Sequence, residues 1–156
     1  MPTLKKKRNV REYISGFVDG EGCFSVSFSK RNKLLVGWEI KPSFSASQNH
    51  DRAEVLSLMQ KYFNCGFIRR DFSDKTLKYE VRSLQELVEK VVPHFEEYEL
   101  LSSKQKDFVL FAKICRLMQE GKHKHSAGLK QIMKLAFQMN VSGKRKYTQA
   151  EIEDSL

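Results

Sequence analysis

Hydrophobic residues recur at helical spacing near the start of the chain and then change to strict alternation. Across residues 10–20 the apolar side chains recur every three or four positions, which predicts an amphipathic helix that Asn9 caps. Across residues 23–29 every second residue is apolar, which predicts a half-buried strand. The alternation resumes at 34–48 after a polar loop, so the two strands form a hairpin with Pro42 at an edge or a bulge.

The same two patterns continue toward the C-terminus. Helical spacing returns at residues 49–63, with Asn49 as the cap, and two short alternating segments follow at 67–72 and 77–82. Further helices are predicted at residues 83–95, 103–119 and 126–139, with a short one from Gln149. Adjacent hairpins separated by helices predict an α+β domain in which helices cover one face of an antiparallel sheet.

The length of 156 residues favours a single domain. We divide it into a basic N-terminal arm at 1–9, a core at 10–140 and a basic C-terminal segment with a short helix at 141–156. No apolar run approaches the roughly 18 residues that a membrane span needs, so we expect no membrane association. The three cysteines are far apart and no signal peptide is evident, which favours an intracellular compartment.

The charge is positive overall and unevenly distributed. The formal net charge of +9 suggests a polyanionic partner, although solubilising lysines are a simpler explanation of the total. Residues 100–147 carry 11 lysines and arginines against two acids, whereas residues 84–99 carry five glutamates against one lysine. The run GKRKY at 143–147 fits a phosphate clamp or a disordered basic tail equally well. One part of the surface is therefore suited to an anion.

The side of the predicted sheet opposite its apolar face carries short hydroxyls and long charged groups. A ribbon with such a face can enter the major groove of DNA and read base edges, although an ordinary solvated face has a similar composition. The candidates for DNA contact on these strands and loops are Ser25, Ser27, Ser29, Arg31, Lys33, Glu39, Lys41, Ser43, Ser45, Ser47, Arg69, Asp71, Lys78 and Arg82.

Glycines and acids are concentrated where the first helix meets the first strand. Gly16 and Gly20 lie on one helix face, where each costs about 1 kcal/mol relative to alanine. Close packing against another helix is the expected compensation. Glu21 lies at the negative end of the helix dipole, where a carboxylate is unfavourable unless a cation is nearby. Asp19 is expected to accept hydrogen bonds from backbone groups across such a helix pair.

The segment ISGFVDGEG, residues 14–22, resembles the LAGLIDADG motif of homing endonucleases position by position. FSASQNHDR, FIRRD, LLSSKQKDFVLF and EGKHKHSAGLKQIMKLAFQMN are similar to later blocks of that family and occur in the same order. The resemblance therefore covers about residues 12–146. Glu21 stands where the motif's name has Asp, and glutamate serves there in many members. The motif occurs once in this chain, as in the homodimeric members.

This resemblance implies an αββαββα fold with a saddle-shaped sheet and a homodimer in which two LAGLIDADG helices pack together. The implied dimer interface comprises Gly16, Phe17, Asp19 and Gly20. The implied activity is cleavage of both strands of double-stranded DNA across the minor groove, at a long and nearly palindromic site, with short 3′ overhangs. Mg²⁺ is the implied cofactor, and Mn²⁺ or Ca²⁺ substitutes for it in binding.

The resemblance also assigns roles to individual residues. Glu21 is the implied metal-binding acid, and Gly20 the implied donor of a backbone carbonyl to the metal. Gln48 resembles the family's water-positioning residue. Arg52 and Lys104 resemble the basic residues around the scissile phosphate, and Arg52 is explained equally well as a surface cation.

Two other functions remain open at the level of sequence. One is an RNA maturase that helps a group I intron to splice, with intron RNA as its partner. The other is a sequence-specific DNA-binding protein without cleavage, which the presence of Glu21, Gln48 and Lys104 together argues against. An organelle (mitochondrion or chloroplast) and a prokaryotic cytoplasm are both compatible with the expected intracellular location.

Overall fold

The computed structural model describes residues 8–156, and residues 1–7, which hold most of the expected N-terminal arm, lie outside the described part. The strands are β1 (Gly22–Lys30), β2 (Trp38–Asn49), β3 (Phe67–Asp71) and β4 (Thr76–Val81). They form one antiparallel sheet in the order β1-β2-β4-β3. The helices are α1 (Val10–Glu21), α2 (Glu54–Phe63), α3 (Leu84–Glu86), α4 (Val92–Glu97), α5 (Lys104–Gln119), α6 (Ser126–Ala136) and α7 (Gln149–Asp154).

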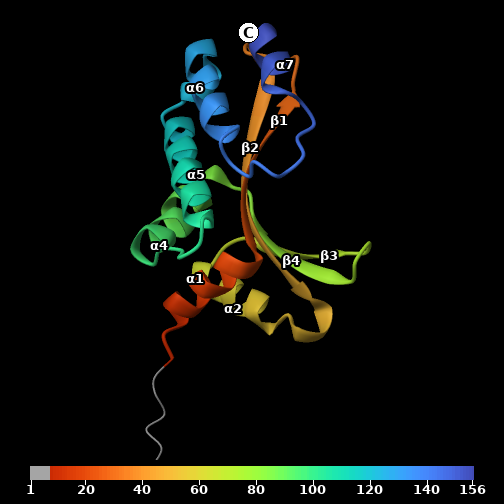
Figure 1. The fold of residues 1–156 in the computed structure, drawn as a ribbon, viewed down its shortest axis with the longest axis vertical. Coiled ribbons are helices and arrows are strands. Elements are labelled where there is room, and N and C mark those ends of the chain that lie inside the picture. Colours follow the sequence, from red (N-terminus) through yellow and green to blue (C-terminus); the bar gives the residue numbers. More distant parts are fainter. Residues whose placement is uncertain (1–7) are drawn as a thin grey trace, which may run out of the picture.

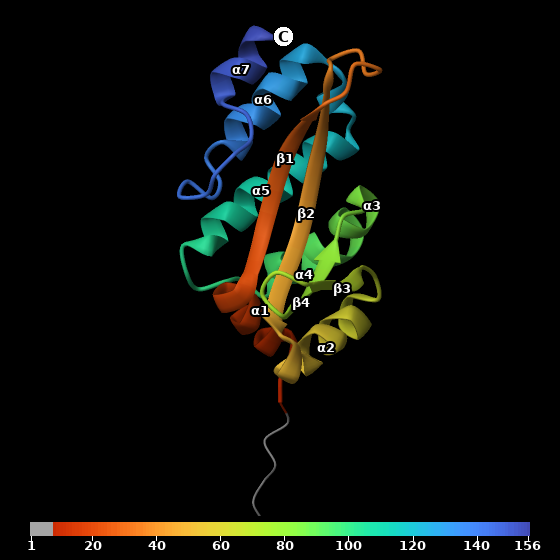
Figure 2. The same ribbon diagram turned by 90° about the vertical axis from the view of Figure 1, so that its right-hand side faces the viewer.

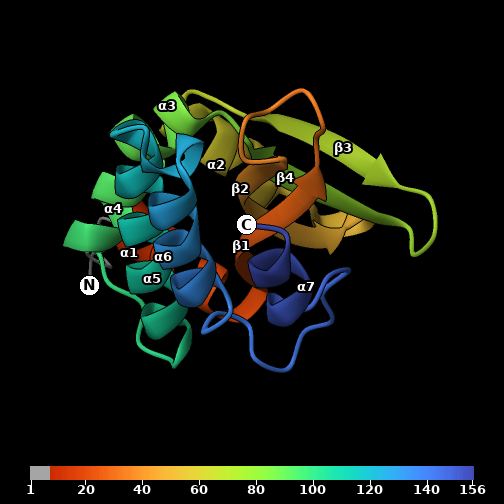
Figure 3. The same ribbon diagram turned by 90° about the horizontal axis from the view of Figure 1, so that it is seen from above.

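The helices α4, α5 and α6 lie along one side of β1 and β2, and the other side of the sheet is open (Figure 1). In Figure 2, which faces the open side, β1 and β2 run in front of α5. The β3–β4 hairpin extends away from the helix layer, so the open side is concave (Figures 1 and 3). The predicted α+β architecture, an antiparallel sheet with helices on one face, is confirmed.

The alternation along β1 and β2 separates a buried face from a polar one. Phe24, Val26 and Phe28 of β1 are buried, and so is Phe44 of β2, which stacks on Phe24 with ring centroids 5.3 Å apart. Phe24 also packs against aromatic rings of α4 and α5. Burying each such side chain contributes about 1.5 to 3 kcal/mol, which fixes the register and directs the alternate side chains to the open side.

Several element boundaries differ from the sequence-based expectation. The second strand begins at Trp38, because residues 34–37 form turns and Gly37 adopts a positive φ of 77°. Asn49 precedes a 3-10 turn, His50–Arg52, and α2 begins only at Glu54. The expected helix at 83–95 is divided by a π-helical segment, Leu87–Val91, just before Pro93, which has no amide proton to donate.

Other local predictions hold. The Asn9 side chain accepts hydrogen bonds from the amides of Arg11 and Glu12 at the start of α1. Pro42 lies opposite Val26 of β1, and β4 pairs with β2 only from Phe44 onward, so Pro42 occupies an edge as predicted.

The C-terminal segment belongs to the core. Ile152 of α7 is fully buried, so the core continues beyond residue 140, where we expected only a basic segment and a short helix. Arg145 donates to the backbone oxygens of Val26 at 2.7 Å and Ala136 at 2.6 Å. Arg145 is therefore not in a disordered tail, because its guanidinium covers the free edge of β1, and a phosphate contact of this segment stays a prediction. None of the helices in residues 8–156 is both long and apolar enough to cross a membrane.

Candidate metal and nucleic-acid site

The acid of the glycine-rich junction lies at the exposed end of α1. Glu21 is the last residue of α1 and is exposed, and the next residue, Gly22, pairs with Ala46 of β2. A Cβ at Gly22 would lie 2.5 Å from a Val18 methyl carbon and 2.8 Å from the Val18 oxygen. Only glycine therefore allows the chain to pass directly from α1 into β1, and this tight passage fixes where Glu21 emerges.

Lys104 supplies the cation that the end of α1 requires. Its ammonium donates to the backbone oxygens of Val18 at 2.9 Å and Gly22 at 2.6 Å. These two carbonyls flank Glu21, so the positive charge lies at the negative end of the helix dipole. The structure thus places Lys104 at the acidic end of α1, and its expected role beside the scissile phosphate stays a prediction.

Asp19 binds groups of its own chain. Its carboxylate accepts from the amides of Leu101 and Ser102, both at 3.0 Å, and from the Ser102 hydroxyl. Burial alone would raise the pKa of Asp19, but these hydrogen bonds outweigh it and lower the pKa below the ordinary value of 3.8. These contacts tie α1 to the loop before α5 within the chain, and the expected contact of Asp19 across a helix pair stays a prediction.

Gln48 and Arg52 lie near the same end of the sheet. Ala46 of β2 pairs with Gly22, which directly follows Glu21, and Gln48 lies two residues further along β2. The Gln48 side chain accepts from the amide of Asn49 at 2.9 Å. Arg52 is exposed in the 3-10 turn, with its Nε 3.8 Å from a carboxylate oxygen of Asp51. Among residues 8–156, no three His, Cys, Asp or Glu side chains converge as metal donors.

One face of α1 is open to a partner. Ile14, Ser15 and Val18 of α1 are buried, whereas Gly16 and Gly20 are exposed. A Cβ at either exposed glycine would meet no atom within 4 Å in the described part of the chain. Packing within this chain therefore does not require glycine at these two positions, in contrast to Gly22.

The open side of the sheet carries the predicted polar residues in cross-strand rows. Ser47, Lys78 and Arg69 form one row across β2, β4 and β3. Ser25 lies opposite Ser43. The candidates are placed on this side or in its loops as follows: Ser27, Arg31, Lys33, Lys41 and Arg82 are exposed, and Ser25, Ser29, Glu39, Ser43, Ser45, Ser47, Arg69, Asp71 and Lys78 are half-buried.

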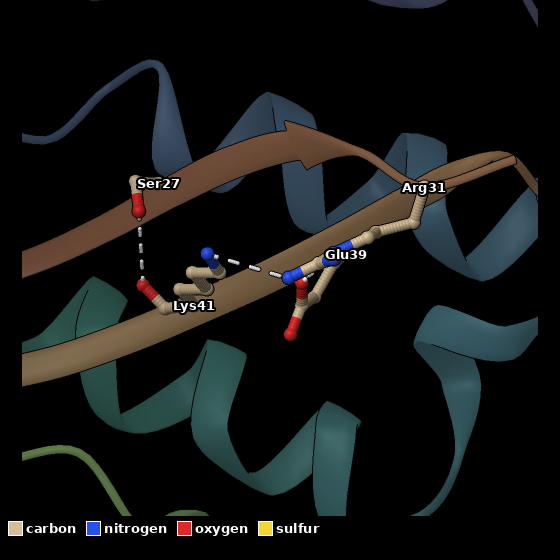
Figure 4. A network of polar contacts seen from close by, with 4 residues as sticks. All are labelled: Ser27, Arg31, Glu39 and Lys41. Carbon is tan, nitrogen blue, oxygen red and sulfur yellow. Dashed lines mark hydrogen bonds and ion pairs between the residues drawn. The ribbon is translucent and has the colours of Figure 1, made fainter. Parts of the chain in front are cut away.

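Acidic residues on this side are already paired. Glu39 accepts from Arg31 Nε at 2.7 Å and lies 3.9 Å from Lys41 Nζ (Figure 4). The hydrogen bond from Arg31 holds the pKa of Glu39 below its usual 4.5. Asp71 accepts from the amide and the hydroxyl of Ser73, so it orders the β3–β4 turn. Glu39 and Asp71 thus fix neighbouring groups, and their contact with DNA stays a prediction.

Residues 14–115 match the family described as LAGLIDADG endonuclease. The chain belongs to this family. It is 35% identical over 129 residues to probable intron-encoded endonuclease 2 of Neurospora crassa, covering 82% of this chain and 28% of that protein. The LAGLIDADG chain thus spans about a quarter of the length of this curated relative.

Solved structures resemble the whole described fold. The I-LtrWI LAGLIDADG homing endonuclease bound to target DNA has a TM-score of 0.87 at 32% identity, over 94% of this chain and 49% of that one. The archaeal intron-encoded homing endonuclease I-Vdi141I, complexed with DNA, has a TM-score of 0.85 at 30% identity, over 93% and 92%. I-SmaMI, bound to uncleaved DNA target in the presence of calcium ions, has a TM-score of 0.84 at 28% identity, over 96% and 49%.

Sequence reasoning missed one acidic residue on the polar side of this LAGLIDADG fold. Glu80 lies between Ser45 and Phe67 in a cross-strand row and is only 6% exposed. It pairs with Arg69 at 3.1 Å and Arg82 at 2.6 Å. Glu80 lies two residues from both Lys78 and Arg82, which were already assigned to this side. Because side chains alternate along a strand, this spacing predicts the same side for Glu80.

The LAGLIDADG helix is fastened to the helix layer by a buried histidine. Ser15 donates its hydroxyl proton to the Tyr98 carbonyl at 2.6 Å, so it can only accept from His94 Nε2 at 3.1 Å. His94 Nδ1 then accepts from the Tyr62 hydroxyl at 2.8 Å. Burial, with a smaller contribution from the positive charge of Arg11, lowers the pKa of His94 from 6.5 to about 4. His94 is therefore neutral at physiological pH, with its proton on Nε2.

We expect the stability of this protein to fall as the pH is lowered from about 6.5 toward 4. The unfolded chain binds a proton at the ordinary histidine pKa of 6.5, whereas folded His94 resists protonation until about pH 4. The unfolded state therefore gains protons first as the pH drops. Urea unfolding of the wild type and of His94→Gln across pH 4 to 8 measures how much His94 contributes to the pH dependence of the free energy of unfolding. A wild-type profile that matches the variant's would remove His94 as the cause.

Proposed function

We propose that this chain is a site-specific homing endonuclease that cuts double-stranded DNA as a homodimer. The observation that carries the proposal is the uncovered glycine face of α1, with the exposed carboxylate of Glu21 at its end. A second copy placed on that face, in contact with Gly16, Phe17 and Gly20, would bring two Glu21 carboxylates together. The names of I-LtrWI and I-Vdi141I, both bound to DNA, support the reaction class.

The acidic end of α1 fits a divalent cation. Hard cations such as Mg²⁺ take oxygen ligands, and Mg²⁺ is commonly held by one or two carboxylates together with substrate phosphates. Glu21 offers an exposed carboxylate, and the backbone carbonyl of Gly20 is the proposed second donor. Two adjacent carboxylates repel each other unless a dication lies between or beside them. I-SmaMI bound to uncleaved DNA in the presence of calcium ions supports a divalent metal. When bound, Mg²⁺ would activate water and stabilise the leaving oxygen of the phosphodiester.

The surrounding residues have proposed roles of their own. Lys104 holds the end of α1 through two carbonyls and carries a positive charge for the scissile phosphate. Gln48, at the end of β2, orients the attacking water by hydrogen bonding. Arg52 is exposed and pairs only loosely with Asp51, so it is available to a phosphate. The polar side of the sheet reads the DNA sequence in the major groove.

Selection from a pool of randomised DNA duplexes tests this function. We expect the protein to enrich one long, nearly palindromic sequence and to cut it when Mg²⁺ is added, with Mn²⁺ as a substitute and Ca²⁺ supporting binding alone. Intron RNA is the alternative partner. Tight binding of a structured intron RNA, together with no enriched duplex, would favour the maturase. We also propose an intracellular location, in an organelle or a prokaryotic cytoplasm, consistent with intron-encoded relatives.

We expect DNA binding to weaken steeply with salt. Lysines and arginines that contact phosphates release counterions, and six to ten such contacts cost roughly 10³- to 10⁵-fold in affinity between 50 and 200 mM salt. The net charge of +9 makes contacts on this scale available. Fluorescence anisotropy with the selected duplex across this range measures the slope. An affinity that is independent of salt would contradict a phosphate-dominated interface.

A further inference from the structure

Glu80 is the most deeply buried charged residue on the polar side of the sheet. Its side chain is 8% exposed, whereas those of its partners Arg69 and Arg82 are 40% and 61% exposed. Glu39 pairs in a similar way with Arg31 and Lys41 near the tip of the β1–β2 hairpin, but it is 38% exposed (Figure 4). A buried carboxylate needs cations and hydrogen bonds around it. Glu80 therefore keeps the guanidiniums of Arg69 and Arg82 close to its carboxylate.

One carboxylate oxygen of Glu80 is hydrogen-bonded to Arg69, and the other forms an ion pair with Arg82 but has no hydrogen-bond partner among residues 8–156. Oε1 accepts from Arg69 Nη2 at 3.1 Å, and Oε2 lies 2.6 Å from Arg82 Nε. The Arg82 guanidinium also lies over the ring of Phe67, 5.2 Å from its centroid. Arg69 of β3 is thus held by a hydrogen bond, and Arg82, which directly follows β4, is held by the ion pair and the Phe67 ring.

Both arginines keep donors for a further partner. Glu80 contacts Nη2 of Arg69 and Nε of Arg82, and the two arginine side chains are 40% and 61% exposed. Arg69 Nε is buried, so the terminal Nη groups are the donors that Arg69 can offer to a base. Arginine recognises guanine through two hydrogen bonds to O6 and N7, which requires the plane of the guanidinium to be oriented. An arginine that is already held loses less side-chain entropy on binding.

We propose that Glu80 is a positioning residue for base recognition, which orients Arg69 and Arg82 toward guanines in the target DNA. This inference rests on the proposed function. Glu80 would then contribute to sequence discrimination and not to affinity, because its negative charge repels the DNA phosphates. Removing that charge therefore lowers sequence discrimination while nonspecific affinity stays the same or rises, a combination that a simple loss of structure does not produce.

The test is selection from randomised duplexes with the wild type, Glu80→Gln and the charge control Glu120→Gln, which lies at the end of α5. Arg69→Ala and Arg82→Ala identify the base pairs that each arginine reads. We expect Glu80→Gln to reduce guanine preference at those base pairs by about fivefold or more, with other positions unchanged. Glu120→Gln should retain the wild-type profile.

Two further variants separate orientation from folding. Glu80→Asp keeps the charge but is one methylene shorter, so it cannot reach both guanidiniums and should show the same local loss. In a background of Arg69→Ala and Arg82→Ala, Glu80→Gln should change the profile no further, because both arginines are already absent. Thermal melts identify the variants that are folded.

The outcomes distinguish this inference from the proposed function. A wild type that enriches no duplex would overturn the proposed function. If the wild type enriches a sequence and folded Glu80→Gln and Glu80→Asp keep full guanine preference at the arginine-dependent positions, Glu80 is not a positioning residue. A loss spread evenly over all positions would also overturn the inference, since it would indicate general damage to the sheet.

Discussion

Glu21→Gln is expected to abolish metal-dependent DNA cleavage while DNA binding survives. The amide has nearly the same shape as the carboxylate but lacks the charge that holds a divalent cation. Even the loss of a group hydrogen-bonded to a metal ligand typically costs roughly 10- to 100-fold, so removal of the ligand itself should cost more than about 100-fold in cleavage rate. Binding should be equal or tighter, because a negative charge near the phosphates is lost. Glu21 is exposed, so the fold should be unaffected.

Cleavage and gel-shift measurements on one selected duplex check this expectation, with Glu120→Gln as a variant of equal charge. Glu120 lies at the C-terminal end of α5 and should behave as the wild type in both measurements. Cleavage by Glu21→Gln at a near-normal rate would remove Glu21 from the mechanism.

Gly20→Leu is expected to separate the proposed dimer without unfolding the protomer. A Cβ at Gly20 meets nothing within 4 Å in the described chain, and replacing a helical glycine should stabilise the isolated helix by about 1 kcal/mol or slightly less. A bulky side chain on the same face would keep a second helix away. We therefore expect a stable monomer of about the chain mass, 18.2 kDa, that no longer cuts DNA.

Gly22→Ala is the matched control for the glycine prediction. Its Cβ would collide with Val18 inside the chain, so this variant should lose thermal stability instead of association. Light scattering and thermal melts of both variants make the comparison. A dimeric and active Gly20→Leu would contradict an interface on this face of α1.

The sequence predicted the features that depend on neighbouring residues. The cap at Asn9, the alternation along β1 and the edge position of Pro42 follow from patterns a few residues long. The resemblance to the family motif also predicted the overall fold and the position of Glu21 at the end of α1. These are the signals that a single chain carries locally.

Contacts between distant segments could not be predicted in the same way. Lys104 reaches Val18 and Gly22 across more than 80 residues, and nothing in its neighbourhood indicates that two carbonyls will hold it. The contact of Asp19 with Leu101 was not predicted, because the two residues lie more than 80 positions apart in the chain. Glu80 was missed because its burial depends on Arg69 in the adjacent strand and on Arg82.

Mapping the cuts on both strands of one selected duplex tests the central claim most directly. With each strand labelled at one end and Mg²⁺ added, the homodimer should cut once per strand, at positions related by the twofold axis of the site and offset to leave short 3′ overhangs. This offset is expected if two Glu21 carboxylates act on opposite strands across the minor groove, as proposed. Cleavage of one strand only, or binding of the duplex with no cut in any divalent metal, would contradict a homodimeric endonuclease.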